Sequence, residues 1–281
     1  MTSVLARMPE LHGQLHLRAA AREDGRTTFA AQAFRAPFHL SKTYWDADAG
    51  VLLAQVVNPT AGILAGDRLE SEIAVEAGAA LCVTTPSASR VFRMNDGTAS
   101  CRQHFTVAAG GWLEVIPEPL VPHRGSRYRQ VTTIEAASGG GLFFVDQLTS
   151  GRVAYGEKWQ WQELVLETTV TLDGELILRE RLAQSGDELR ALAGLAGSGD
   201  SACFANAVLL APDTAVDAPW RGAVAALHGD GLWAGVGGLR RGGWSIKLVA
   251  SDPPRMRSAL RRLRAELAAY FPRLRCDPRK V

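Results

Sequence analysis

Short apolar runs with a period of two dominate the hydrophobic pattern of this chain. Apolar residues alternate with polar ones in segments separated by small, glycine-rich turns, a pattern typical of half-buried strands. The expected strands are Leu11–Leu17, Thr27–Phe34, Val51–Val57, Leu69–Val75, Val165–Leu172, Glu175–Leu182 and Cys203–Leu210, with two more inside Leu232–Val249. Asp173-Gly174 suits a tight hairpin turn between two of them. We therefore expect a mainly β protein.

A strand–turn–strand unit repeats in the middle of the chain. Val75–Leu81 is matched by Val107–Leu113, 32 residues later, and more loosely by Ile134–Leu142, 27 residues after that. Each copy joins the end of one strand to the start of another through small residues. Such repetition predicts stacked β-sheet layers, β-helix-like, in which each unit buries its apolar face on the next. Because the composition forces no boundary, we expect a single domain over residues 1–281.

Helices are expected to be few, two or three in number. Asp217-Ala218-Pro219 is a typical helix start, and that helix should run to about His228. A second, amphipathic helix should follow Pro253 and cover about residues 254–270, with arginines opposite its apolar face. Its apolar positions are Met256, Leu260, Leu263, Leu267 and Tyr270. By contrast, the small and polar stretch Gly186–Asp200 predicts a mobile loop.

The formal charge of +2 is unevenly distributed. Residues 251–281 hold nine Lys/Arg and three acids, a charge of +6, which leaves −4 for the rest. This basic end could face an acidic partner surface or could be a solvated helix face. No aromatic residues are interleaved on its exposed side, so we expect no nucleic-acid partner. Four widely spaced cysteines, no signal-like N-terminus and no apolar run of membrane-spanning length favour a cytoplasmic protein without a membrane partner.

Candidate chemistry rests on isolated carboxylates, because the familiar catalytic and nucleotide-binding motifs are missing. Asp67 follows a glycine-bent corner between two strands, where it could simply cap its own backbone. Asp146 and Glu180 each interrupt an apolar strand, Glu180 on the face of Leu176 and Leu178. A buried acid needs a partner, a hydrogen-bond network or a cation. For Glu180, a salt bridge with an arginine on a neighbouring strand would satisfy that need equally well.

Several segments together resemble one known family. The loop Asn58-Pro59-Thr60-Ala61-Gly62-Ile63-Leu64-Ala65-Gly66-Asp67-Arg68-Leu69 is similar to the signature loop of the urease accessory proteins UreD, called UreH in some systems. Four further segments match in the same order, namely Leu81–Arg93, Gly97–Ala99, Ala109–Glu114 and Ser150–Glu157. The family usually carries glycine where Ala61 and Ala65 stand, which requires those two residues to keep a negative φ.

The resemblance implies a non-catalytic factor in urease maturation with a mainly β, stacked fold. Such proteins act with UreF, with the GTPase UreG and with apo-urease, and a dimer within a larger complex is compatible with that role. No tightly bound cofactor is implied: Ni²⁺ would be in transit, and GTP would enter only through UreG. The signature-loop residues are Asn58, Pro59, Gly62, Gly66 and Asp67. The metal-transit candidates are Asp67, Asp146 and Glu180, with the hydroxyls of Thr84, Thr85, Ser87 and Ser89. The partner-contact candidates are Ser150, Gly151, Arg152, Gly156, Glu157, Arg261 and Arg264.

Two other functions remain open from the sequence. A carbohydrate-active hydrolase on a β-helix could use Asp67, Asp146 and Glu180 as paired acids. Release of reducing sugar from a polysaccharide would support that function, whereas copurification with UreF would support the first. A purely structural scaffold that never contacts metal is the third alternative.

Overall fold

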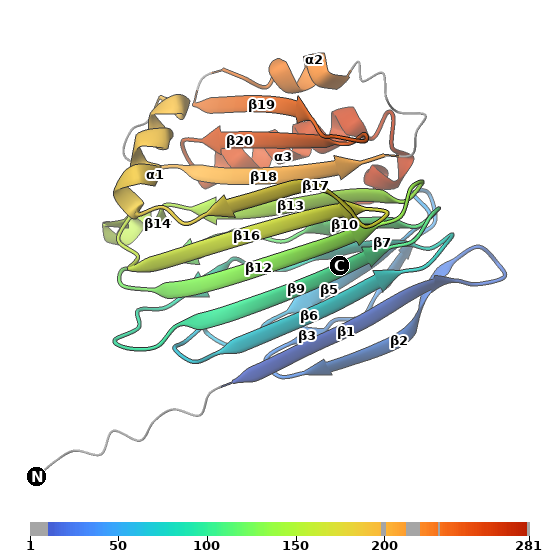
Figure 1. Ribbon diagram of the computed structural model, residues 1–281, viewed down its shortest axis with the longest axis horizontal. Helices are drawn as coiled ribbons and strands as arrows, with labels where there is room; N and C mark the ends of the chain where they lie inside the picture. Colours follow the sequence, from blue (N-terminus) through green and yellow to red (C-terminus); the bar gives the residue numbers. More distant parts are fainter. Residues whose placement is uncertain (1–10, 198–200, 212–219, 230, 280–281) are drawn as a thin grey trace, which may run out of the picture.

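The chain folds into two stacked sheets, and two helices of its C-terminal part cover the outer face of one of them. The computed structural model describes residues 11–197, 201–211, 220–229 and 231–279. Over these residues a seven-stranded sheet has the order β17-β16-β12-β9-β6-β1-β2, and a larger sheet of eleven strands contains β19-β20-β18-β13-β10-β7-β5-β3. Figure 1 shows the first sheet in front of the second, with the C-terminal strands and helices at the top. The expected mainly β, stacked fold is confirmed.

The repeated units form the parallel coils at the centre of both sheets. In the seven-stranded sheet β6 (Arg68–Val75), β9 (Ala99–Val107) and β12 (Arg127–Ala136) run parallel. They alternate along the chain with β7 (Ala80–Thr84), β10 (Trp112–Ile116) and β13 (Gly141–Thr149), which are parallel in the other sheet beside β5 (Val51–Val57). The connecting turns stack as well, because Gly78 N–H donates to the Gly110 carbonyl and Gly110 N–H to the Gly139 carbonyl. The predicted repeat is therefore the coil of the fold.

Antiparallel strands close the ends of the sheets. β1 (His12–Ala21) runs parallel to β6 and antiparallel to β2 (Thr27–Arg35). β16 (Glu163–Leu172) runs parallel to β12 and antiparallel to β17 (Glu175–Leu182), across the predicted Asp173-Gly174 turn. In the other sheet β18 (Cys203–Leu210), β20 (Trp244–Ala250) and β19 (Leu232–Gly238) follow β13. The shorter strands are β3 (His39–Leu40), β4 (Tyr44–Asp46), β8 (Ser89–Val91), β11 (Leu120–Pro122), β14 (Gly151–Arg152) and β15 (Glu157–Lys158).

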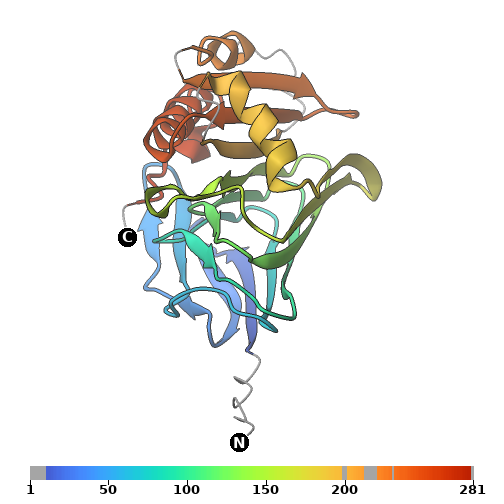
Figure 2. The same ribbon diagram turned by 90° about the vertical axis from the view of Figure 1, so that its left-hand side faces the viewer.

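Apolar side chains fill two separate layers. One lies between the sheets and includes Leu17, Leu81, Phe105 and Ile134, each at most 1% exposed. The other lies on the outer face of the larger sheet, where α2 (Trp220–Ala225) and α3 (Pro253–Leu267) cover it. Figure 2 views the coils end on, with the helices gathered at the C-terminal part of the molecule. The fold thus has three layers, two of sheet and one of helix.

The helices agree only in part with the predictions. Asp252 is the N-cap residue of α3, and its carboxylate accepts a hydrogen bond from the Arg255 N–H. The helix buries the predicted apolar face except Tyr270, which lies beyond the helix end. The predicted mobile loop at Gly186–Asp200 is wrong over its described part. Ser185 and Glu188 form a reciprocal capping box that starts α1 (Gly186–Ala193), followed by a 3₁₀ turn over Gly194–Ala196. The predicted start of the earlier helix at residues 217–219 lies outside the described residues.

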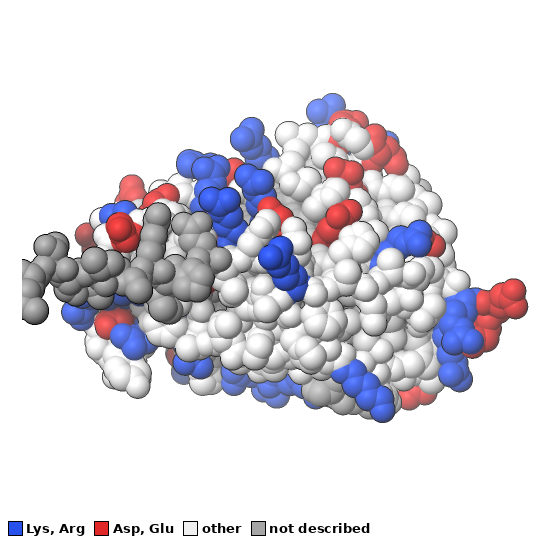
Figure 3. Space-filling view, turned by 90° about the horizontal axis from the view of Figure 1, so that it is seen from below, with Lys and Arg blue, Asp and Glu red and all other residues white. Residues whose placement is uncertain are grey.

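The outer surface near β1 and β2 carries both signs of charge. Seen from below, Lys/Arg and Asp/Glu side chains are interspersed among uncharged ones (Figure 3). Ion pairs such as His12–Glu70 and Arg18–Glu76 join neighbouring strands there. In the described part of the chain, no helix is both long and apolar enough to cross a bilayer.

Candidate functional site

The signature loop between β5 and β6 is closed by its own polar groups. The Asn58 side chain accepts hydrogen bonds from the backbone N–H and the hydroxyl of Thr60, at 3.1 and 2.7 Å. Asp67 is buried, and its carboxylate accepts a 2.8 Å hydrogen bond from the Leu64 N–H. Asp67 therefore caps its own loop, and it is not among the residues that line a described cavity. Asp67 thus has the local capping role that the sequence pattern gave as the alternative to metal transit.

Close packing explains the glycines and alanines of that loop. A methyl group at Gly62 would lie 2.7 Å from a backbone oxygen of the strand beside it, so this position has no room for a side chain. Gly66 has a φ of +84°, a left-handed value that glycine adopts readily. Among the described residues, Ala61 and Ala65 are not in the set of non-glycine residues with positive φ. The two alanines therefore fit the loop without backbone strain.

A cavity of about 170 Å³ lies between the two sheets, next to the signature loop. We call it the inter-sheet cavity. It brings together five of the predicted metal-transit residues, namely Thr84, Thr85, Ser87, Ser89 and Asp146. Asn58 and Gly62 of the signature loop also line it. Sequence segments separated by as many as 88 positions thus meet in one enclosed space, because parallel coils place their strand ends side by side.

Asp146 is the acid of the inter-sheet cavity that lies deepest in the sheet. It projects from β13 toward β12, where the Gln130 side chain donates a 3.1 Å hydrogen bond to it. Burial raises the pKa of Asp146 to about 6, against the lowering effect of the hydrogen bonds from Gln130 and the Gln147 backbone. Its carboxylate is therefore ionised at neutral pH, but loses its charge a little below it.

Most of the other polar groups of this cavity are uncharged, although Arg90 and Glu118 also line it. The Tyr128 hydroxyl donates to the Gln130 side chain at 3.1 Å, which continues the network that ends on Asp146. Cys101 also lines the cavity, and burial raises the pKa of its thiol to about 12. Since a thiolate, not a thiol, is the strong metal ligand, Cys101 is a poor one at neutral pH. The sequence prediction missed Tyr128, Gln130 and Cys101. Each places a polar group at an inward-facing position of a strand in which apolar and polar residues alternate.

Glu180 lies elsewhere and has a different partner from the one expected. Its carboxylate forms a 2.6 Å ion pair with Lys247 of β20 and a 3.4 Å hydrogen bond with the Ser245 hydroxyl. The predicted shared face with Leu176 is wrong, because Leu176 is 50% exposed. A β-bulge opposite Val170 shifts the register of β17 and reverses the face of the residues before it. The three acids Asp67, Asp146 and Glu180 therefore do not share one cavity.

A second cavity, of about 560 Å³, lies between the larger sheet and α3. Four arginines, Arg257, Arg261, Arg264 and Arg279, line it, and we call it the arginine cavity. It shares a wall with the inter-sheet cavity, formed by Thr84, Thr85, Pro86, Pro117, Glu118 and Gln147. The two spaces are therefore neighbours, separated by one layer of side chains.

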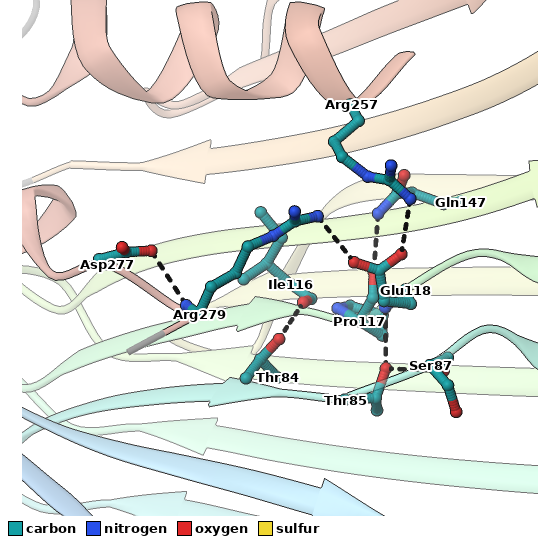
Figure 4. Close-up of polar contacts among 10 residues, drawn as sticks. All are labelled: Thr84, Thr85, Ser87, Ile116, Pro117, Glu118, Gln147, Arg257, Asp277 and Arg279. Atoms are coloured by element: carbon teal, nitrogen blue, oxygen red, sulfur yellow. Dashed lines mark hydrogen bonds and ion pairs between the residues drawn. The ribbon is translucent and has the colours of Figure 1, made fainter. Parts of the chain in front are cut away.

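Hydrogen bonds hold the shared wall in place (Figure 4). The Thr84 hydroxyl donates to the Ile116 carbonyl at 2.9 Å, and the Thr85 hydroxyl accepts from the Glu118 N–H at 2.8 Å. The Gln147 side chain donates to the Pro117 carbonyl at 2.6 Å. The hydroxyls of Thr84 and Thr85, two of the predicted metal-transit residues, thus hold the wall together. Their hydrogen bonds join the end of β7 to the end of β10 and the residues that follow it.

Arg264 is turned inward rather than toward a partner. It forms a bidentate ion pair with Glu114 of β10, at 2.7 and 3.0 Å, and donates to the Cys276 carbonyl at 2.7 Å. The Glu114 side chain is fully buried and that of Arg264 is 11% exposed. The expected exposed position of Arg264 is therefore wrong, whereas Arg261 is exposed, as expected.

The loop that follows β13 combines a rigid base with an exposed tip. Arg152 and Glu157 pair at 2.7 and 2.9 Å, and the Arg152 guanidinium lies over the Tyr155 ring. Hydrogen bonds from Arg152 lower the pKa of Glu157. At the base, a side chain at Gly151 would collide with two backbone oxygens, and its φ is +115°. The Arg152–Glu157 ion pair therefore shapes the turn from within, while Tyr155, at the tip, is 74% exposed.

These features define a class: a stacked-sheet scaffold with internal cavities lined by isolated polar groups. Among the described residues, no three His, Cys, Asp or Glu side chains come together in a way that could hold a metal ion.

Comparisons with known proteins identify the family. The model of the UreD urease accessory protein family matches residues 11–280. The chain is 65% identical over 269 residues to a urease accessory protein UreD of Opitutus terrae, covering 96% of this chain and 98% of the relative. A Deinococcus radiodurans UreD is 32% identical over 259 residues, 91% of this chain and 89% of the relative. A Yersinia enterocolitica UreD is 44% identical over 142 residues, 50% of this chain and 43% of the relative. The chain belongs to the UreD family of urease accessory proteins.

Proposed function

We propose that this chain helps to deliver nickel to apo-urease, together with UreF and UreG, and that the ion passes through the inter-sheet cavity. The observation that carries the proposal is the meeting of Asp146 with four hydroxyl residues in that cavity. The family membership supports a role in urease maturation. GTP would act only on UreG, and this chain would provide the path and the contacts rather than a reaction.

The chemistry of the cavity suits an ion in transit. Thiolates and imidazoles bind Ni²⁺ tightly, whereas carboxylates, hydroxyls and water bind it more weakly. A passage must attract an ion and then release it, so few carboxylates among hydroxyl and amide oxygens are appropriate. Asp146 and Glu118 are the acids that line this cavity, and the Glu118 carboxylate already pairs with Arg257 and Arg279. The raised pKa of Cys101, about 12, supports the same conclusion, because its thiol stays protonated. Asp146 would supply the attraction above pH 6, where it is charged.

The loop over residues 150–157 is the contact site that we propose for a partner protein. Its base is fixed by the Arg152–Glu157 pair, so the tip has one defined shape. Val153, 40% exposed, and Tyr155, 74% exposed, present an apolar and aromatic surface of the kind that interfaces favour. A rigid loop also loses little conformational entropy on binding.

The test is the nickel content of urease matured in cells that carry Asp146→Asn or wild-type protein. Asparagine keeps the size and the hydrogen bond from Gln130 but removes the charge. We expect about a tenfold lower nickel content with undiminished copurification of UreF. Asp48→Asn is the control, because Asp48 is an exposed acid that does not line the cavity, and its replacement should leave the nickel content unchanged. Glu180 is unsuitable, because its charge contributes to the raised pKa of Asp146.

Two results would refute the proposal. Full nickel loading with Asp146→Asn would show that the cavity does not carry the ion, and would favour the purely structural scaffold. Equal loss with Asp48→Asn would show that the loss is not specific to the cavity.

A further inference from the structure

We propose that the arginine cavity is the docking site for an acidic segment of a partner protein in the maturation complex. The inference rests on the proposed function only in so far as this chain acts with partner proteins. It does not require that nickel passes through the inter-sheet cavity. The partner is defined by its chemistry: an extended segment that carries a carboxylate next to an apolar side chain.

Charge is the first argument. The cavity is lined by four arginines and two acids, Glu118 and Asp277, so positive charges exceed negative ones by two. A cavity with walls of low dielectric concentrates such a field and attracts the opposite charge. Glu114 of β10 pairs with Arg264, so an excess of one positive charge remains when this acid is counted as well. An anionic group from another molecule would complete the site.

Glu118 shows how a carboxylate is held there (Figure 4). Its two oxygens contact different arginines, Arg279 at 3.0 Å and Arg257 at 3.7 Å, while its own N–H donates to Thr85. The side chain of Glu118 is 24% exposed, so this arrangement lies at the edge of the cavity rather than inside the core. The same wall can therefore orient guanidinium groups toward an incoming carboxylate.

Arg261 is the arginine left for the partner. Arg264 is committed to Glu114, and Arg257 and Arg279 share Glu118. Arg261 lies one turn from Arg257 on the same helix, and within the described residues it has no hydrogen bond or ion pair. Arginine binds carboxylates in a bidentate manner and with defined geometry.

The floor of the arginine cavity is apolar, so the partner's segment must also carry an apolar side chain. Leu148 and Phe204 from the sheet and Met256 and Leu260 from α3 line it. Methionine and aromatic side chains on such a floor adapt to an inserted apolar group. At about 560 Å³, the space is large enough for two or three side chains of a peptide. A small inorganic anion would leave this floor unfilled, so a peptide segment fits the cavity better.

The experiment is a peptide array of overlapping twelve-residue segments from the urease subunits and accessory proteins of the source organism. The array is probed with the purified full-length chain, as wild type, as Arg261→Glu and as Arg262→Glu. Arg262 is the matched control, since it is the next residue on α3, is exposed, and does not line the cavity. Both substitutions lie on the exposed side of α3, so thermal unfolding should confirm that each variant is folded.

We expect the wild-type chain to capture segments that combine Asp or Glu with an apolar residue. Arg261→Glu should weaken that capture at least about tenfold, the effect of replacing one charge-assisted contact by a repulsion, whereas Arg262→Glu should change it less than about twofold. Capture of neutral segments, or equal losses for both variants, would overturn the inference. Asp146→Asn should leave capture intact, so failure of the docking inference and failure of the nickel proposal give different results.

Discussion

Replacing Asp146 by asparagine should stabilise the protein, and by an amount that depends on pH. The pKa of Asp146 is about 6 in the folded chain, against an ordinary value of 3.8. Each pKa unit corresponds to 1.36 kcal/mol, so the ionised carboxylate costs about 3 kcal/mol of folding free energy at pH 8. Asparagine has no charge to bury and can still accept the hydrogen bond from Gln130.

The sign of the pH dependence follows from which state binds the proton more tightly. Because the folded-state pKa is raised, the stability cost is absent below pH 3.8, where both states are protonated. It grows between pH 3.8 and 6, where the unfolded chain is ionised and the folded chain still holds its proton, and it is constant above. The advantage of the asparagine variant should therefore be about 3 kcal/mol at pH 8 and should approach zero near pH 4.

Urea denaturation followed by tryptophan fluorescence at pH 8, 6 and 5 measures this difference. Asp48→Asn is the control, because Asp48 is an exposed acid on a turn, and its replacement should change stability by less than about 0.5 kcal/mol at each pH. A difference that stays constant with pH, or an asparagine variant that is less stable at pH 8, would refute the reasoning. A variant that gains stability and loses nickel delivery would show that the acid is kept for function.

Three further predictions concern the framework around the cavities. Arg264→Met should lower the free energy of unfolding, measured in urea, by about 3–5 kcal/mol, because it leaves Glu114 buried and unpaired. Adding Glu114→Leu should restore most of that stability, and a double variant as unstable as Arg264→Met would contradict the prediction. Gly151→Ala should lower the free energy of unfolding, measured by thermal unfolding, by more than about 2 kcal/mol, because a methyl group there collides with backbone oxygens. Gly156→Ala, at a φ of +70° but in open space, should lower it by about 1 kcal/mol. Equal losses for the two variants would contradict the clash at Gly151. Asp67→Ala should lower the free energy of unfolding in urea by about 1–2 kcal/mol, because the loop loses its cap. The nickel content of urease, per amount of folded Asp67→Ala protein, should stay unchanged, and a change would assign Asp67 a direct role in nickel loading.

The coils were predictable because each repeats the same local chemistry. The alternation before and after Val75–Leu81 fixes which side chains face inward, and the small residues between them permit only a tight turn. Since neighbouring coils repeat this unit, their turns lie at the same level and their strands become parallel neighbours. The sequence therefore contained both the strands and their order in the central part of each sheet.

Two features of the fold have a local sequence signal that composition hides. Ser185 and Glu188 have the spacing of a capping box, which predicts a helix start, although the small and polar composition of the stretch after them is typical of a loop. Glu114 interrupts the apolar strand Trp112–Ile116 just as Asp146 interrupts its own, so the same argument predicts a buried partner for it.

Other features could not be deduced from local pattern. The partner of Glu114 is 150 positions away on α3, and nothing in the helix distinguishes Arg264 from its neighbours before the helix is docked. The bulge that reverses one face of β17 follows from its pairing with β16, so the sequence of β17 alone indicates a regular alternation. The cavities likewise depend on how loops from different coils meet, which no single segment specifies.

The apolar outer face of the larger sheet has a consequence for synthesis of the chain. Val51, Leu53, Cys82 and Phe143 lie in the apolar cluster on that face together with side chains of α2 and α3, which are synthesised after these strands. Until these helices are made, the growing chain exposes a broad apolar surface beside strands that have already formed. Nascent proteins aggregate under such conditions. A chain cut before α3 should accumulate in inclusion bodies, because part of this apolar face then stays exposed to water.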